Sequence, residues 1–322
     1  RHAEHYSALS TDQWGNRPGR SAIDVAALKM CTYHLFHLTR TGGGTFDNDA
    51  TACYDRIVMS LAILRGRQLG LPAPAAQLLS DFLSKAKYFV KTQVHQSSES
   101  YSSDKEHFLH GPGQGTIFGP PVWLVVCTLI MDAVPQKATP VHFSSPDGTT
   151  TITRYMDGFV DDTTGWTNDF HHSLRQGTSA STIHKQLTLL AHWWEELLTT
   201  TGGKLELPKC FFYIVHFDFD IDGLPHLHEF SEDDPVGRMR ERDSVSGELV
   251  SVTSYNTTKA HKPLGVWLSP DLSNSAEYSH ILKKMHSLCT RLLPHRLDDH
   301  VVKRFLLSMC RPSICYGTPL ST

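Results

Sequence analysis

The sequence predicts an α+β fold in which an antiparallel sheet is backed by helices. The segment 155–166 has the pattern of a strand, a tight turn and a second strand. Of the 322 residues, 40% are hydrophobic and 20% are charged, which is normal for a globular protein that buries one large core or two smaller ones. Four longer segments are predicted as the helices that back the sheet: 57–69, 73–94, 122–134 and 178–200.

The tip of the predicted hairpin carries two adjacent carboxylates, Asp161 and Asp162, after the apolar pair Phe159 and Val160. Like charges this close raise each other's pKa, and a divalent cation removes that penalty. A hairpin tip would hold both carboxylates rigidly and in the open, as a catalytic metal site requires. Because Asp-Asp pairs are also common in solvated turns, the motif gains its weight from other segments.

A third acid, Asp49, lies where a predicted strand leads toward the helix that starts near residue 58, and Tyr54 follows it by five residues. This arrangement is typical of one half of a polymerase site. In such a site two Mg²⁺ ions about 4 Å apart hold the attacking 3′-oxygen and the leaving pyrophosphate. Mg²⁺ takes its ligands from carboxylates and substrate phosphates. The acids must therefore converge from two chain segments, Asp49 from one and the Asp pair from the other.

A loop rich in glycine and proline, residues 110–121, lies between the two acidic segments. Glycines allow a backbone to approach a ligand closely, and Pro120 and Pro121 start the apolar helix that follows. The loop would then present Gln114 to a nucleotide or a template. An ordinary turn before a core helix is the alternative interpretation of this loop.

Taken together, these segments resemble a reverse transcriptase of the non-LTR retrotransposon and group II intron type. Asp49 with Tyr54 is similar to the first palm motif of that family. Gly113-Gln114-Gly115 is similar to its Gln-Gly loop, and Phe159-Val160-Asp161-Asp162 to its aromatic-x-Asp-Asp motif.

Three further segments resemble the family in its own order, so that the resemblance spans residues 10–320. The segment 13–21 is similar to the fingers segment, and 262–266 to the strand that closes the palm. The segment 202–210 is similar to the fourth palm motif, with Lys209 in its lysine position.

The resemblance implies a right-hand polymerase architecture. A fingers remnant would span 1–44, a palm 45–270, with a surface loop or an extra hairpin at 231–259, and a partial helical thumb 271–322. The chain starts at Arg1 without a methionine, so we expect a fragment. The family's upstream fingers strands, which carry an arginine for the triphosphate, would precede it, and the fragment alone could be inactive.

The implied activity is that of an RNA-directed DNA polymerase of a retroelement. This nucleotidyltransferase would bind an RNA template and extend a DNA or RNA primer with dNTPs, using two Mg²⁺ ions or Mn²⁺. The implied metal ligands are Asp49, Ala50, Asp161 and Asp162. The implied nucleotide-binding residues are Tyr54, Gln114, Gly115 and Phe159. The implied nucleic-acid contacts are Arg17, Arg20, Lys283 and Lys284.

Lys209 completes the implied catalytic residues, beside the three acids. The resemblance implies that it approaches the triphosphate, where a lysine is a plausible acid for the leaving pyrophosphate if nearby charge tunes its pKa. An ordinary lysine at the entry of a strand is the alternative.

Tyr54 distinguishes two classes of polymerase. A large ring under the incoming sugar leaves no room for a 2′-hydroxyl. RNA-directed RNA polymerases instead tend to have a polar residue there and Gly-Asp-Asp at the hairpin, whereas Val160 precedes the Asp pair here. Both features favour dNTPs. A further alternative is a decayed or domesticated palm that binds RNA without catalysis, which the loss of an acid would favour; all three acids are present.

The net charge of −3 argues mildly against a nucleic-acid-binding protein. Local charge matters more, because seven basic residues occur in the helical segment 283–311 against two acids. They predict a thumb that grips a duplex backbone, and a solvated helix face is the alternative. The seven are Lys283, Lys284, Arg291, Arg296, Lys303, Arg304 and Arg311.

The seven cysteines form no Cys-x-x-Cys pair, and several lie in apolar runs like the thiols of a reducing compartment. We expect no signal peptide, and the most apolar run, 122–131, is too short to span a bilayer. The expectation is therefore an intracellular protein, nuclear or cytoplasmic, that has no membrane partner. The oligomeric state stays open.

The segment 218–223, with Glu229, fits the calcium loop of an EF-hand. The preceding residues 211–219 alternate like a strand rather than a helix, and Pro225 is unsuited to the loop. We predict a hairpin that turns at Asp222-Gly223 instead. The histidines, including His226 and His228, show no metal-binding spacing.

Overall fold

The structure of the protein, a computed structural model, describes residues 2–103, 111–168, 179–231, 233–292, 294–295 and 297–316. Parts of the predictions above lie outside these ranges: Arg1, His110 of the glycine-rich loop, Thr178 at the start of a predicted helix, the basic residue Arg296, and residues 317–322 of the predicted thumb.

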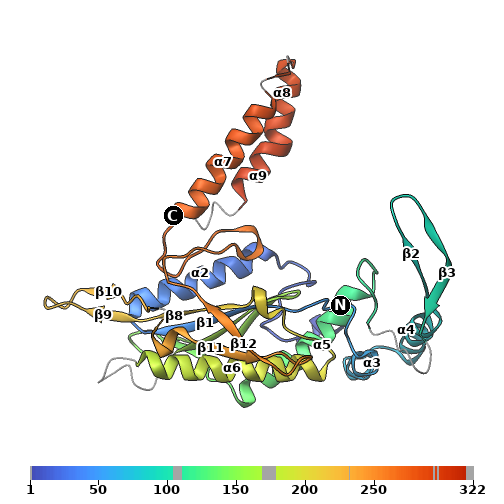
Figure 1. Ribbon diagram of the computed structural model, residues 1–322, viewed down its shortest axis with the longest axis horizontal. Coiled ribbons are helices and arrows are strands. Elements are labelled where there is room, and N and C mark those ends of the chain that lie inside the picture. Colours follow the sequence, from blue (N-terminus) through green and yellow to red (C-terminus); the bar gives the residue numbers. More distant parts are fainter. Residues whose placement is uncertain are drawn as a thin grey trace.

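A six-stranded sheet forms the centre of the molecule, with its strands in the order β11, β12, β8, β1, β7, β6 (Figure 1). Helices pack on both of its faces, which confirms the predicted α+β class. The strands are β1 (Gly43–Asp49), β6 (Met156–Phe159), β7 (Asp162–Asn168), β8 (Phe211–Val215), β11 (Met239–Arg242) and β12 (Leu249–Ser254).

The sheet is mixed rather than antiparallel throughout. β1 pairs antiparallel with β7 and β8, and β6 pairs antiparallel with β7. β12 runs parallel to β8, so the predicted antiparallel sheet is wrong at this edge. The segment 231–259 contains the predicted extra hairpin, β11 and β12, which extends the main sheet because β12 pairs with β8. Its Met239 and Val252 are buried in the core.

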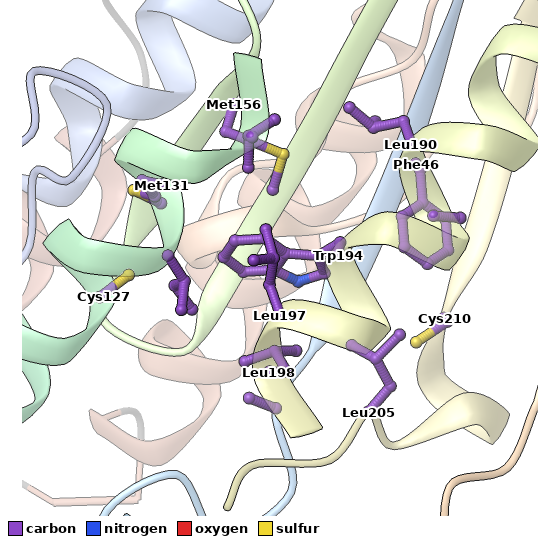
Figure 2. Packing of buried hydrophobic residues seen from close by; sticks show 14 of the residues in the cluster. Phe46, Cys127, Met131, Met156, Leu190, Trp194, Leu197, Leu198, Leu205 and Cys210 are labelled. Carbon is purple, nitrogen blue, oxygen red and sulfur yellow. The ribbon is translucent and has the colours of Figure 1, made fainter. Parts of the chain in front are cut away.

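Two helices, α5 (Gly119–Ala133) and α6 (Ala180–Thr200), cover one face of the sheet and form the main core with it. Figure 2 shows the centre of this core, where Trp194 lies among Met131, Phe46 and other apolar side chains. Burial of these side chains is the main force that holds the layers together. Both helices occupy segments that the sequence predicts as helical.

Helix α2 (Ala22–Thr39) covers part of the opposite face. Its Tyr33 packs edge-to-face on Trp166 of β7. Trp166 lies opposite Thr45, in the first half of β1. The helix therefore shields the beginning of β1, whereas Asp49 at the end of the same strand lines a surface pocket.

Two helices and a hairpin lie to one side of the sheet (Figure 1). The helix predicted over 57–69 is confirmed, but the helix predicted over 73–94 ends at Lys85. The residues that follow pair as strands instead, and the rings of Tyr88 and Tyr101 stack across them. These elements are α3 (Met59–Gln68), α4 (Ala73–Lys85), β2 (Lys87–Lys91) and β3 (Gln96–Ser102).

The predicted turn at Asp222-Gly223 is confirmed. β9 (Phe217–Phe219) and β10 (Pro225–Leu227) pair antiparallel, and Gly223 has φ +77° in the turn between them. This hairpin projects from the sheet on the side opposite to β2 and β3 (Figure 1). The shorter elements elsewhere are α1 (His2–His5), β4 (Val141–Ser144) and β5 (Thr151–Arg154).

The strand expected over 262–266 is absent from the structure. Its residues form a 3₁₀ turn, Pro263–Gly265, in which Leu264 has φ +51°, because Pro263 cannot donate a ladder hydrogen bond. Three helices follow and project away from the sheet (Figure 1), as predicted for this region. They are α7 (Ser275–Leu292), α8 (Asp299–Phe305) and α9 (Arg311–Cys315). No helix in the described ranges is both long enough and apolar enough to cross a membrane.

Candidate active site

The structure brings the three predicted acids together at one end of the sheet. Asp49, the last residue of β1, lies directly opposite Asp162, the first residue of β7. Residues opposite each other on antiparallel strands point to the same face. Asp161 lies in the two-residue turn that joins β6 to β7, beside this pair.

This turn has an unusual backbone. Val160 has φ +64°, a left-handed conformation that a β-branched residue adopts only at a cost of about 1–3 kcal/mol. Two side chains hold it there. The Trp123 indole donates a hydrogen bond of 2.6 Å to the Val160 carbonyl, and the Gln13 amide oxygen accepts one of 3.3 Å from the Val160 amide. The turn is therefore clamped from α5 and from the segment before α2.

Gln13 belongs to a short extended stretch that pairs with β6. It forms a parallel bridge to Gly158, and the Trp14 amide donates to the Gly158 carbonyl at 2.8 Å. Gly15 then passes so close to the turn that a Cβ atom there would lie 2.4 Å from the Val160 nitrogen. Part of the predicted fingers segment thus positions the acidic turn.

The close approach of Gly15 gives a testable expectation. Gly15→Ala should displace the turn, lower the free energy of unfolding by about 1–3 kcal/mol and reduce any activity of the acids. Urea unfolding and primer extension measure the two effects. Gly66→Ala is the control: Gly66 lies inside α3, where an added Cβ meets only the flexible Leu71 side chain at 3.3 Å. That change should raise stability by up to about 1 kcal/mol. Equal effects of the two changes would contradict the positioning role.

The acids repel one another. Burial, together with the charge of Asp49, raises the pKa of Asp161. Burial and the charges of Asp161 and Asp49 raise the pKa of Asp162 to about 6. The repulsion shows that the three carboxylates share one region, where a cation would be favourable.

Lys209 supplies one positive charge to this region. It ends a 3₁₀ turn, Leu207–Lys209, and its Nζ lies 2.6 Å from Asp49 Oδ2. Its hydrogen bond to Asp49 raises the pKa of the lysine. Because 66% of the side chain is exposed, the ammonium group can leave this carboxylate without unfolding anything.

The raised pKa of Asp162 gives a pH-dependent stability. The folded chain binds this proton more tightly than the unfolded chain, so the stabilising contribution is full below pH 3.8 and is lost as the pH rises through about 6. We expect Asp162→Asn to exceed the unchanged protein in stability at pH 7.5 by about 1 kcal/mol, because solvent screens this exposed group. This advantage should be about halved at pH 5, which lies between the two pKa values, and should vanish only below pH 3.8.

Urea unfolding of both proteins in EDTA measures this difference. Asp12 and Glu241 have pKa values raised by burial to about 6 and about 7, and they titrate equally in both proteins. The difference between the proteins therefore reports Asp162 together with its repulsion from Asp161 and Asp49. A constant difference from pH 5 to 7.5 would contradict the assignment.

A buried ion pair lies beside the acids, on the same face of the sheet. Lys29 of α2 forms an ion pair with Asp47, and its Nζ is 3.0 Å from His261 Nε2 and 3.2 Å from Thr164 Oγ1. The Lys29 side chain is only 2% exposed. Although burial opposes ionisation, the Lys29 charge lowers the pKa of Asp47. Burial and the same charge lower the pKa of His261 to about 3, so this ring is neutral.

Breaking this pair should destabilise the protein. Lys29→Met leaves the Asp47 carboxylate buried without its cation, which should cost about 3–5 kcal/mol. The double change Lys29→Met, Asp47→Asn removes both charges and should recover much of that loss. Lys137→Met, which breaks an exposed pair with Glu196, is the control and should cost less than about 1 kcal/mol. Chemical denaturation of the four proteins provides the comparison, and a single variant as stable as the control would refute the role.

A pocket of about 220 Å³ joins the acids to this ion pair. Asp49, Asp162 and Lys209 line one part of it, and Lys29 and Asp47 line another. Its walls therefore alternate acidic and basic groups, which suits a ligand that carries both a phosphate and a metal ion.

Tyr54 lies in a turn rather than in the first turn of a helix, because α3 begins only at Met59. Its ring packs 3.3 Å from the position that a Cβ of Gly119 would take. A Cβ atom added at Gly111 would lie 1.8 Å from the backbone carbonyl oxygen of Tyr54, so only glycine fits at position 111. The glycine-rich loop thus packs against the Tyr54 segment.

The same loop carries the two predicted residues Gln114 and Gly115, both of which are exposed. The backbone N–H of Gln114 donates a hydrogen bond of 2.9 Å to the carboxylate of Asp55, the residue after Tyr54. The loop and the segment after Asp49 are thereby joined. Phe159 is half-buried opposite Asp162, and Ala50 is buried and bridges to Leu205.

The predicted nucleic-acid contacts differ in their surroundings. Arg17 is buried and bonds Glu4, the Ser10 carbonyl and the Gln13 carbonyl, so it holds its own segment rather than facing a phosphate. Arg20 is partly exposed and lies over the Trp14 ring at 4.5 Å.

The two predicted lysine contacts both lie on α7. Lys283 is exposed. Lys284 is partly exposed, and its ammonium group donates to the Ser313 carbonyl at 2.9 Å. A phosphate could reach Lys283 directly, whereas Lys284 also links α7 to α9.

Comparison with known proteins adds no family. No family model matches the chain, and no curated protein gives a significant match. Within the described ranges, no three or more His, Cys, Asp or Glu side chains are arranged as a ready metal site. The functional assignment therefore depends on the geometry of the acids and their neighbours.

The sequence analysis missed the residues that support the acids. Trp123 lies in an apolar helix, and no residue near it in the sequence indicates that its indole binds the Val160 carbonyl. Lys29 and Asp47 gave a weak signal: a lysine stands inside the apolar stretch around Met30, and Asp47 precedes Asp49 by two residues, the spacing that places both on one face of a strand. A charge on an otherwise buried helix face calls for a buried partner.

Proposed function

We propose that the protein is an RNA-directed DNA polymerase of a retroelement, with the described sheet as its palm. The observation that carries the proposal is the meeting of Asp49, Asp161 and Asp162 at one end of the sheet, from segments far apart in the sequence. Three carboxylates that repel one another beside a pocket suit a reaction assisted by metal ions. Such an enzyme acts inside the cell, in the nucleus or the cytoplasm.

Mg²⁺, or Mn²⁺, is the proposed cofactor, as two ions. Asp49, Asp161 and Asp162, with the adjoining Ala50, would hold the ions, and substrate phosphates would complete the coordination. The fit rests on the raised pKa of Asp161 and Asp162, because such carboxylates gain from a nearby cation. Bound ions would stabilise the negative charge on the attacking 3′-oxygen and on the leaving pyrophosphate.

The protein side chains would bind and orient the nucleotide. Lys209 now bonds Asp49, and a triphosphate in the pocket would offer its exposed ammonium group a second anionic partner. From there it could donate a proton to the pyrophosphate. Tyr54 would form the floor under the sugar, and the loop with Gln114 would lie against the base or the template strand.

The RNA template and the primer would lie along the projecting helices. Lys283, Arg291, Lys303, Arg304 and Arg311 are exposed on these helices. Each contact between such a cation and a phosphate releases counterions, so binding should weaken as salt increases. This region is the proposed thumb, and the segment that contains Gln13 is the proposed fingers remnant.

Primer extension tests the proposal. The chain is incubated with poly(rA), oligo(dT) and either dTTP or UTP, in Mg²⁺ or Mn²⁺. We expect incorporation of dTTP, and none by Asp161→Asn. Preferred incorporation of UTP would identify an RNA-directed RNA polymerase instead.

A binding experiment covers the case in which the chain does not turn over. Electron paramagnetic resonance counts Mn²⁺ bound in the presence of dTTP, with Asp49→Asn and Asp161→Asn as variants. We expect both changes to reduce binding by more than about tenfold, because each removes a metal ligand. Two results would indicate a non-catalytic RNA-binding palm. Either the chain binds RNA but does not bind Mn²⁺-dTTP, or Asp49→Asn and Asp161→Asn both leave the binding of Mn²⁺-dTTP unchanged.

A further inference from the structure

The hairpin of β9 and β10 carries four potential metal-binding side chains on one face. His226 lies directly opposite Asp218 in the register of the two strands. The His228 amide donates to the His216 carbonyl at 2.9 Å, which continues the same pairing. Because side chains alternate along a strand, His216 and Asp218 share one face, as do His226 and His228 across from them.

The three imidazoles surround the Asp218 carboxylate. His228 Nδ1 lies 2.6 Å from Asp218 Oδ2, and His226 Nε2 lies 3.9 Å from the same oxygen. His216 Nε2 lies 3.8 Å from Oδ1. In a tetrahedral site with metal–ligand bonds near 2.0 Å, neighbouring ligand atoms are about 3.3 Å apart. The two separations to Oδ2 and the one to Oδ1 each lie within about 0.7 Å of that value.

The state of His216 also favours a metal ligand. The buried Nδ1 atom of His216 has no hydrogen-bond partner among the residues that the structure describes, and its Nε2 atom is too far from Asp218 for a hydrogen bond. The faces of this ring pack near His228 and Phe230, so it is the nitrogen atoms that have poor partners.

We propose that His216, Asp218, His226 and His228 form a binding site for a divalent ion of the zinc class. Three imidazole nitrogens and one carboxylate oxygen form a ligand set that Zn²⁺ binds in proteins, whereas Mg²⁺ and Ca²⁺ prefer oxygen ligands. The site is separate from the proposed polymerase site. It does not depend on the proposed function.

The side chains as they stand do not meet at one point, in keeping with the lack of a preassembled metal group among the residues that the structure describes. The hydrogen bond between His228 and Asp218 places a proton where the ion would bind, and His216 and His226 lie 3.8 and 3.9 Å from the carboxylate. Asp218 and His226 are 42% and 59% exposed, so both can rotate without disturbing the core. His228 lines a hollow of about 510 Å³, through which an ion can enter from solvent.

The position of the hairpin indicates what the ion would do. The hairpin continues from Val215, which pairs with Gly43 at the start of β1, so it lies at the opposite end of the sheet from Asp49. Its strands have three residues each, and Ile221 and Phe219 near its tip are exposed. A two-stranded ribbon of this length is marginally stable by itself. Four ligands from both strands would fix it as a structural site does.

Co²⁺ is the spectroscopic probe for the test. Titration of the full chain with Co²⁺ should give the intense visible absorption of a tetrahedral ion at one equivalent, and one equivalent of Zn²⁺ should remove it. His228→Ala and Asp218→Asn should each weaken binding by more than about 100-fold, since removing a ligand costs more than the 10- to 100-fold lost with an outer partner. His95→Ala, at an exposed position of another hairpin, should bind like the unchanged chain.

The titration is repeated with Asp161→Asn, which leaves the hairpin intact. Equal absorption in this variant places the Co²⁺ at the hairpin whether or not the chain polymerises. Zn²⁺ should also slow proteolysis at the tip near Ile221 in the unchanged chain and leave the rate in His228→Ala unaltered. Absence of a tetrahedral spectrum, or a spectrum that survives both His228→Ala and Asp218→Asn, would overturn the proposal.

Discussion

Asp161→Asn is expected to abolish primer extension, by at least about 1,000-fold in kcat/KM, and to leave the free energy of unfolding unchanged or slightly higher. The carboxylate lies beside Asp49 and Asp162, and its negative charge raises the pKa of Asp162. Removing this charge relieves repulsion in the free protein. It also removes a ligand that a metal ion requires, so function and stability should respond in opposite directions.

The experiment needs both readouts on the same preparation. Primer extension on poly(rA) with oligo(dT) measures function, and urea unfolding in EDTA measures stability. Asp81→Asn is the matched control, because Asp81 is a partly exposed helix residue of α4. It should leave extension unaltered. A variant that loses activity because it unfolds would identify the Asp pair as structural, and a variant that keeps activity would remove Asp161 from the site.

The acids themselves could be predicted from the sequence. Asp161 and Asp162 follow an apolar strand and precede a second one, and this alternation fixes a hairpin with the acids at its tip. Asp49 ends another strand, at the entry to the segment before α3. Neither pattern says that β1 and β7 are neighbours. Their pairing is a long-range contact, and the resemblance to a reverse transcriptase, not the spacing, made it an expectation.

The clamp on the turn could not be predicted in the same way. Val160 adopts a left-handed backbone although its type disfavours it, because Trp123 and Gln13 bind both of its backbone groups. Tertiary contacts here outweigh a local preference, as they do at strained functional turns. The buried pair of Lys29 and Asp47 is a similar case, since the sequence indicates a buried charge in each segment but does not identify its partner.

The wrong secondary structure has a physical cause as well. The residues after Lys85 contain Tyr88 and other aromatic or β-branched side chains, which favour strands. The helix predicted over 73–94 therefore includes residues that form a strand. The end of α4 depends on the pairing of β2 with β3, which lies several residues downstream. The helical pattern located α4 but neither β2 nor the residue at which the helix ends.

Tyr54→Ala is expected to reduce discrimination against rNTPs by about 100-fold, while dNTP incorporation falls much less. The ring would form the floor of the pocket under the sugar, where it would exclude a 2′-hydroxyl by steric contact alone. Removing the ring opens that space without touching Asp49 or the Asp pair. A loss confined to selectivity is the mark of a steric block, because a residue needed for chemistry would lower both rates together.

The surroundings of Tyr54 support a fixed position for this ring. It packs against Gly119 at the start of α5, and its backbone packs against Gly111. Burial is the main cause that raises the pKa of the phenol, and the Asn16 side chain beside it acts in the opposite direction. A ring held by contacts on several sides can exclude a hydroxyl, whereas a mobile ring would move aside.

The measurement is kcat/KM for dTTP and for UTP on the same primer and template. Tyr54→Phe keeps the ring and loses only the phenol, so it should preserve discrimination if the block is steric. Tyr88→Ala removes a ring from the β2–β3 hairpin and should change both substrates alike. If Tyr54→Ala leaves the ratio of the two constants unchanged, Tyr54 is a packing residue and the sugar is selected elsewhere. Tyr54→Phe keeps the ring and removes only the hydroxyl. If it loses discrimination as fully as Tyr54→Ala, selection depends on the hydrogen bonding of the phenol and not on the bulk of the ring.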